Sequence, residues 1–250
     1  DGVPIDQWAA ATVATLEQRI TAMIAVLDAV GSAHRMLVLH RDLKPANVLV
    51  DKDGRERVID FGIAKRMDLS DQTAEMLPLS APYAAPELLT GAPVGPPVDV
   101  YGAAAMLYEL AAGRPPVDLS GVPVALAIGR ILDVEPMRLS AMTDASVLAK
   151  APKALVADLD AILAKALRKD ADARYPTLEA LRADLSRALE GRAVAARAGD
   201  RAYRLRRNAW RARWPIAASA AVLLTLSGGL ISTSIQKREA EAARDAALAE

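Results

Sequence analysis

The residues of this chain that could do chemistry are concentrated in residues 40–47 and in one aspartate that follows them. The segment reads His-Arg-Asp-Leu-Lys-Pro-Ala-Asn and brings Asp42, Lys44 and Asn47 within six positions. Asp60 begins an Asp-Phe-Gly triplet further along. A carboxylate can accept a proton from a hydroxyl group, and carboxylate and amide oxygens are the ligands that Mg²⁺ takes. These residues suit phosphoryl transfer, in which a protein mainly positions groups and neutralises charge.

A third motif, Ala-Pro-Glu at residues 85–87, completes an ordered set. Each triplet alone is a weak signal, but in this order the three motifs resemble the catalytic loop, the metal-binding turn and the end of the activation segment of protein kinases. Residues 1 to about 190 resemble the bacterial eukaryotic-like Ser/Thr protein kinase family, and Lys44 points to the serine/threonine branch. The resemblance implies ATP and Mg²⁺ as cofactors, and protein substrates with Ser or Thr acceptors.

The resemblance also assigns the catalytic and nucleotide-binding residues. Asp42 is expected to accept the proton of the acceptor hydroxyl, and Lys44 to reach the γ-phosphate. Asn47 and Asp60 are the expected metal ligands, and Leu49 is expected to lie under the adenine.

A second set of residues is expected to hold or regulate this site. Asp99 resembles the family's buried aspartate that holds the catalytic-loop backbone. Glu87 and Arg174 resemble the family's buried ion pair. His40 and Phe61 are expected to stack in the interior. Arg41 is expected to grip a phosphorylated activation loop. The hydroxyl residues of this set are Ser80, expected to touch Asp42, and Ser70 and Thr73, which are either regulatory sites or plain loop hydroxyls.

Helices predominate among the elements that must position these residues. The apolar spacing predicts a helix over residues 20–30 that ends near Gly31, and residues 48–50 and 57–59 flank a turn that predicts a β-hairpin. Residues 63–84 lack a period and are expected to form a long functional loop. A nearly apolar run at 99–112 predicts a buried helix, and two more helices are expected at 153–168 and 177–190, with Thr177 as an N-cap.

The composition changes after Gly191, where arginines crowd a segment that holds one acid, Asp200. Residues 215–235 carry no charge, and a helix of that length spans about 30 Å, the thickness of a bilayer core. A buried core helix is the alternative. The arginine excess predicts a single-pass protein of the inner membrane with its kinase region in the cytoplasm.

The predicted fold class is therefore α+β and mainly helical, a protein-kinase-like large lobe with one short β-hairpin followed by a single transmembrane helix. The predicted domains are the C-terminal lobe of a protein kinase domain at 1–192, an Arg-rich cytoplasmic juxtamembrane segment at 193–214, the transmembrane helix at 215–235 and the start of an extracytoplasmic helical region at 236–250.

Composition and missing motifs limit the function further. Thirty-one basic and 31 acidic residues give no net charge, so no nucleic-acid partner is expected, and the absence of cysteine excludes disulfides and thiolate metal sites. The 250 residues hold no Gly-rich phosphate loop and no Val-Ala-x-Lys strand. We therefore expect a fragment that is inactive without an N-terminal lobe. The alternatives are a pseudokinase scaffold and a small-molecule phosphotransferase of kinase-like fold, and a homodimer stays open.

Overall fold

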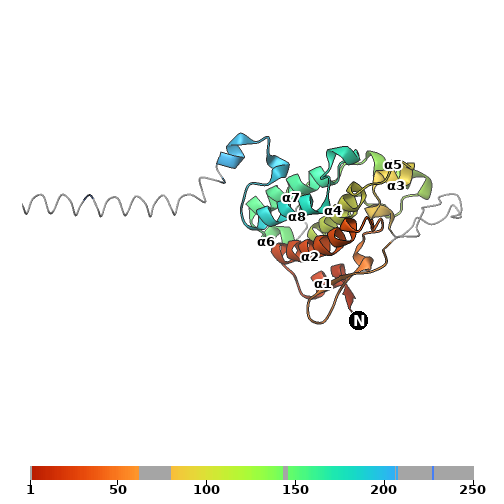
Figure 1. The fold of residues 1–250 in the computed structure, drawn as a ribbon, viewed down its shortest axis with the longest axis horizontal. Coiled ribbons are helices and arrows are strands. Elements are labelled where there is room, and N and C mark those ends of the chain that lie inside the picture. Colours follow the sequence, from red (N-terminus) through yellow and green to blue (C-terminus); the bar gives the residue numbers. More distant parts are fainter. Residues whose placement is uncertain (1, 62–79, 143–145, 206, 208–226, 228–250) are drawn as a thin grey trace, which may run out of the picture. The chain divides into compact units, whose positions relative to one another are not determined.

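The computed structural model describes residues 2–61, 80–142, 146–205, 207 and 227. The chain divides into two units, residues 1–199 and 200–250. Figure 1 shows the elements of the first unit. Their bounds are β1 (Val3–Pro4), α1 (Ile5–Ala11), α2 (Leu16–Arg35), η1 (Pro45–Asn47), β2 (Val48–Val50), β3 (Glu56–Val58), η2 (Ala81–Tyr83), α3 (Pro86–Thr90), α4 (Pro97–Ala112), α5 (Val124–Asp133), η3 (Leu139–Ala141), α6 (Ser146–Lys150), α7 (Lys153–Ala166), η4 (Ala171–Ala173), α8 (Leu178–Leu189) and η5 (Ala195–Arg197).

Four helices form the core of the first unit. Helix α4 packs against α2, α7 and α8, and nearly all of its residues are buried, as its apolar sequence predicted. Helix α2 begins with a capping box in which Thr15 and Gln18 exchange side-chain and backbone hydrogen bonds. Thr177 caps α8 as predicted, because its side chain accepts a hydrogen bond from the backbone of Ala180. Local sequence signals therefore fix where these helices begin.

The end of α2 differs from the prediction. The helix passes through Gly31 and ends at Arg35. A Cβ atom at Gly31 would lie 3.0 Å from Oε1 of Glu179 on α8. The glycine therefore stands where α8 approaches α2 and does not stop the helix, although glycine after an apolar stripe is a common stop signal.

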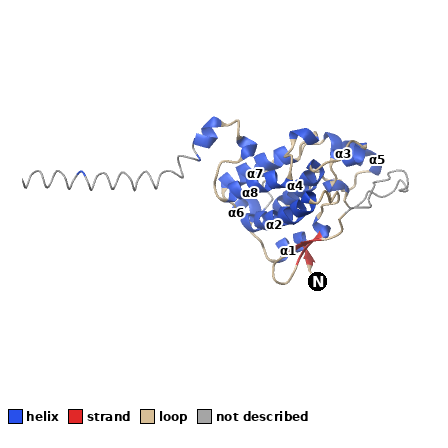
Figure 2. Ribbon diagram, in the orientation of Figure 1, coloured by secondary structure: helices blue, strands red, loops and turns tan. Residues whose placement is uncertain are grey.

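The predicted β-hairpin is present, but it belongs to a larger sheet. Strands β2 and β3 are antiparallel, and the turn between them contains Gly54 with φ +76°. Strand β1 adds a third strand, in which Val3 pairs with Val50. The expectation of a single hairpin was wrong because a strand of two residues is too short to show alternation. Figure 2 shows this small sheet beside the N-terminus.

The sequence patterns also missed four of the shorter helices, α1, α3, α5 and α6. Three of them have seven residues or fewer, which is too short for a helical period to stand out. The predicted membrane segment at 215–235 lies outside the described residues except for Ser227, and the segment at 236–250 lies outside them entirely. Within the part of the chain that the structure describes, no helix is both long and apolar enough to span a membrane.

Candidate active site

The loop between α2 and β2 brings the three predicted catalytic residues together. Nζ of Lys44 donates a hydrogen bond to Oδ2 of Asp42 over 3.0 Å. Nδ2 of Asn47 donates to the backbone oxygen of Asp42 over 2.8 Å and to its Oδ2 over 3.2 Å. The side chain of Asp42 is 10% exposed and that of Lys44 is 17% exposed, so the charges face each other with little water between them. The carboxylate is thus held in one orientation by a cation and an amide.

Asp99, at the start of α4, binds the backbone of this loop through its side chain. Its two oxygens accept hydrogen bonds of 2.7 Å from the backbone N–H groups of His40 and Arg41. Arg41 has φ +63°, a left-handed conformation that costs a non-glycine residue about 1–2 kcal/mol. The two charge-assisted bonds offset that cost. Asp99 therefore fixes the turn immediately before Asp42.

His34 is a member of this network that the sequence did not reveal. Its Nε2 lies 2.7 Å from Oδ2 of Asp99, so the two residues hydrogen-bond across α2 and α4. They are 65 positions apart, and no spacing rule relates them. Only the packing of α2 against α4 brings them together.

The strand that leads to Asp60 contacts the same loop. The backbone N–H of Ile59 donates to the backbone oxygen of Asn47 over 2.9 Å, so the two predicted metal ligands lie on neighbouring backbone segments. The rings of His40 and Phe61 lie 4.8 Å apart and are tilted by 44°, the contact that we expected. Burial lowers the pKa of His40, and Nε2 of this ring lies 3.1 Å from the oxygen of Ile59.

The donor set at this place fits a hard cation. Asn47 turns Nδ2 toward Asp42, which directs the amide oxygen away from that carboxylate. Asp60 is exposed and has φ +54°, a conformation that aspartate tolerates better than most residues. An amide oxygen and an exposed carboxylate are ligands of the kind that Mg²⁺ binds together with nucleotide phosphates. Leu49, expected under the adenine, lies half-buried in β2.

A small cavity of about 40 Å³ adjoins Asp42, and Ser80 lines it together with Arg41. The remaining lining residues are Leu43, Tyr83, Ala84 and Leu88. The structure thus places Ser80 beside the predicted catalytic aspartate. Ser70 and Thr73 lie outside the described residues.

Tyr83 is a second residue that the sequence analysis missed. Its hydroxyl donates a hydrogen bond of 2.5 Å to Oε2 of Glu109 on α4. Burial raises the pKa of Glu109, and the bond from Tyr83 offsets part of that rise. A glutamate inside a nearly apolar helix needs a hydrogen-bond partner when it is buried. The position of Glu109 in the sequence therefore indicated that some polar side chain contacts it, although not which one.

The ion pair expected between Glu87 and Arg174 is present and buried. Nη1 and Nη2 of the arginine each donate a 2.7 Å hydrogen bond to one carboxylate oxygen. The remaining donors of Arg174 bind the backbone oxygens of Pro97, Arg168 and Lys169. The guanidinium therefore joins the start of α3, the start of α4 and the loop before α8.

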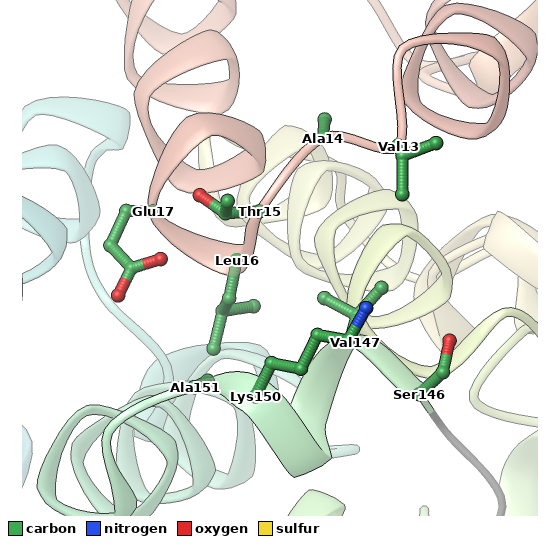
Figure 3. Close-up of a pocket in the computed structure, with 9 residues that line it drawn as sticks. All are labelled: Val13, Ala14, Thr15, Leu16, Glu17, Ser146, Val147, Lys150 and Ala151. Carbon is green, nitrogen blue, oxygen red and sulfur yellow. The ribbon is translucent and has the colours of Figure 1, made fainter.

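A cavity of about 110 Å³ lies away from these residues, at the start of α2. Figure 3 shows Val147 and Lys150 of α6 facing Leu16 of α2 across it. None of the predicted catalytic or metal-binding residues lines this cavity. The candidate active site is therefore the group of side chains around Asp42, which includes Lys44 and Asn47.

Comparison with known proteins agrees with this geometry. A family model described as the protein kinase domain matches residues 5–185. A probable serine/threonine-protein kinase of Streptomyces coelicolor is 36% identical over 186 residues, which cover 73% of this chain and 26% of that protein. The serine/threonine-protein kinase PknB of Mycobacterium tuberculosis is 34% identical over 181 residues, which cover 71% of this chain and 27% of PknB.

The chain spans about a quarter of the length of the curated relatives it matches. PknB of Mycolicibacterium smegmatis is 36% identical over 172 residues, 66% of this chain and 25% of that protein. These relatives confirm the predicted kinship with bacterial serine/threonine kinases. Because the family model covers most of its length, the chain belongs to the protein kinase family.

Proposed function

We propose that this protein transfers the γ-phosphoryl group of ATP to serine or threonine residues of proteins, itself included. The observation that carries the proposal is the carboxylate of Asp42, held by Lys44 and Asn47 beside an open cavity. The cavity beside this carboxylate leaves room for the hydroxyl group of an acceptor. The family relationship supports the same reading.

Each residue of the site then has a role in the transfer. Asp42 orients the acceptor hydroxyl and accepts its proton, which a positioned carboxylate can do within hydrogen-bond reach. Lys44 stabilises the negative charge of the transferred group, and its bond to Asp42 keeps it there. Asn47 and Asp60 would hold Mg²⁺, which supplies charge neutralisation when it is bound with ATP. Leu49 would support the adenine.

The surroundings of the cavity favour a protein as the acceptor. Ser80 and Tyr83 follow the long segment at 62–79 and border the cavity beside Asp42. The buried pair of Glu87 with Arg174 ties the end of this region to the helical core. An extended chain could lie across such a platform with its hydroxyl group at Asp42. In the same proposal, exposed Arg41 binds a phosphate on Ser70 or Thr73.

We further propose that the protein is a single-pass protein of the inner membrane. The support is the uncharged run at 215–235 and the arginine-rich segment 193–214 before it, with the kinase region at 1–192 in the cytoplasm. A reporter that fluoresces only in the cytoplasm should be bright when fused after Arg192 and dark when fused after Glu250. Bright fluorescence at both positions would contradict a membrane span, and the reverse pattern would contradict the orientation.

The catalytic assignment is tested by Asp42→Asn in the protein expressed from its complete gene. The amide keeps the size of the side chain but cannot accept the proton, so we expect phosphorylation of Ser and Thr to fall roughly 10²–10⁴-fold. Incorporation of radiolabelled phosphate followed by phosphoamino-acid analysis measures this.

Asp53→Asn is the matched control, because Asp53 is exposed in the β-hairpin turn. It should leave the rate unchanged. Equal rates for wild type and Asp42→Asn would refute the role of Asp42. No phosphorylation by the wild-type protein together with tight ATP binding would instead favour a pseudokinase.

A further inference from the structure

The ordered part of the lobe continues beyond the segment that the family model matches. The model match ends at residue 185, yet the first unit of the structure extends to Gly199. Helix α8 ends before Gly191, which has φ +66° and turns the chain back on itself. Val194 is then 1% exposed. We call residues 191–199 the strap.

A buried carboxylate on α8 holds the strap. Asp184 is fully buried, and its oxygens accept hydrogen bonds from the backbone N–H groups of Ala195 over 2.6 Å and Ala196 over 2.8 Å. The same carboxylate accepts bonds of 2.8 Å from the hydroxyl of Tyr175 and from Nη1 of Arg187. Two of its four donors thus belong to the strap. A buried charge with four donors is stable only while these donors stay in place.

A second buried carboxylate holds the end of the strap. Nη1 of Arg197 donates to Oδ1 of Asp158 on α7 over 3.3 Å. Asp158 is 1% exposed at its side chain, whereas Arg197 is 26% exposed. The element η5, which contains Arg197, packs against α7. The strap is therefore anchored on two different helices through two carboxylates that water does not reach.

We propose that the strap is a latch that fixes where the chain leaves the kinase lobe and shortens the tether to the membrane. The tether length rests on the proposed membrane span at 215–235. With the strap docked, the 15 residues 200–214 separate the lobe from that span. With the strap released, the tether begins at Glu190 and has 25 residues. The latch thus decides which substrates near the membrane the active site can reach.

Hydrogen–deuterium exchange on the 250-residue chain in detergent micelles, followed by mass spectrometry, tests the latch independently of catalytic activity. We expect the amides of Ala195 and Ala196 to exchange slowly in the wild type. In Asp184→Asn the new NH₂ group faces a backbone donor, so these amides should exchange at least tenfold faster. Asp160→Asn is the matched control, because Asp160 also accepts two backbone N–H groups, those of Leu139 and Ser140. It should change exchange at 139–140 and leave the strap unchanged.

A second variant acts on the strap alone. Ala195→Pro removes one donor to Asp184, and Val194 already has φ −83° and ψ 144°, the conformation that a residue before proline prefers. We expect faster exchange at Ala196 with unchanged exchange in α4. The proposal is overturned if the wild-type strap amides exchange as fast as an unstructured peptide, or if they stay protected in both variants. A missing membrane span would leave these results unchanged and remove only the tether argument.

Discussion

The pair of Glu87 and Arg174 offers the sharpest test of how α3 is attached to the helical core. The two side chains share two hydrogen bonds of 2.7 Å, and both residues are less than 9% exposed. The perturbation is a double-mutant cycle made of Glu87→Ala, Arg174→Ala and both together. If the pair acts as a unit, removing the second partner should cost little once the first is gone.

The structure sets the size of each effect. Removing one partner of a buried pair leaves an unpaired charge and costs about 3–5 kcal/mol. Arg174→Ala should lie at the upper end of that range, because this arginine also donates to three backbone oxygens and lies 5.0 Å from the ring of Tyr101. Either loss is a large part of the about 5–15 kcal/mol that stabilises a domain. We expect a coupling energy of about 2–3 kcal/mol between the two positions.

Urea unfolding followed by circular dichroism at 222 nm measures the four free energies of the cycle. The exposed pair of Arg192 with Glu190 is the control, because its side chains are 49% and 52% exposed at a distance of 3.0 Å. Its coupling energy should be at most about 0.5 kcal/mol. A coupling energy below about 0.5 kcal/mol for the buried pair would refute our reasoning. If a single alanine variant does not fold, Glu87→Gln gives a milder cycle with the same sign.

Two further predictions concern buried groups in the core. Tyr101→Phe should leave the melting temperature unchanged or raise it, since this hydroxyl is buried without a partner among the described residues, whereas Tyr108→Phe should cost about 1 kcal/mol because its hydroxyl donates to the backbone of Met137. Burial lowers the pKa of His40 below 6.5, so stability should fall as pH drops through 6.5 toward the folded-state value, by at most about 1.4 kcal/mol per pH unit. Urea titrations from pH 7.5 to 5 give the free energy of unfolding at each pH, and this free energy should depend less on pH in His40→Tyr than in the wild type. An identical pH dependence in the two proteins would contradict the prediction.

The sequence alone predicted the parts of the fold that depend on local chemistry. The long helices were predicted because their apolar stripes repeat over many turns, and the hairpin because Gly54 allows the left-handed turn. The motif around Asp42 was predictable for a similar reason. Its lysine and asparagine lie within five positions, so a single loop brings them together.

Only the tertiary structure decided the contacts between residues that are far apart in the sequence. His34 reaches Asp99 across 65 positions, and the strap reaches Asp184 after the chain reverses beyond α8. No periodicity encodes such contacts, because they depend on which helix faces pack and on which buried charge needs a donor. Gly31 shows the same limit. Its place after an apolar stripe predicts the end of a helix, but the structure shows that the glycine leaves space for the close approach of α8. The sequence therefore determined which groups are available for the proposed phosphoryl transfer, and the packing of α2, α4 and α8 decided how firmly they are held.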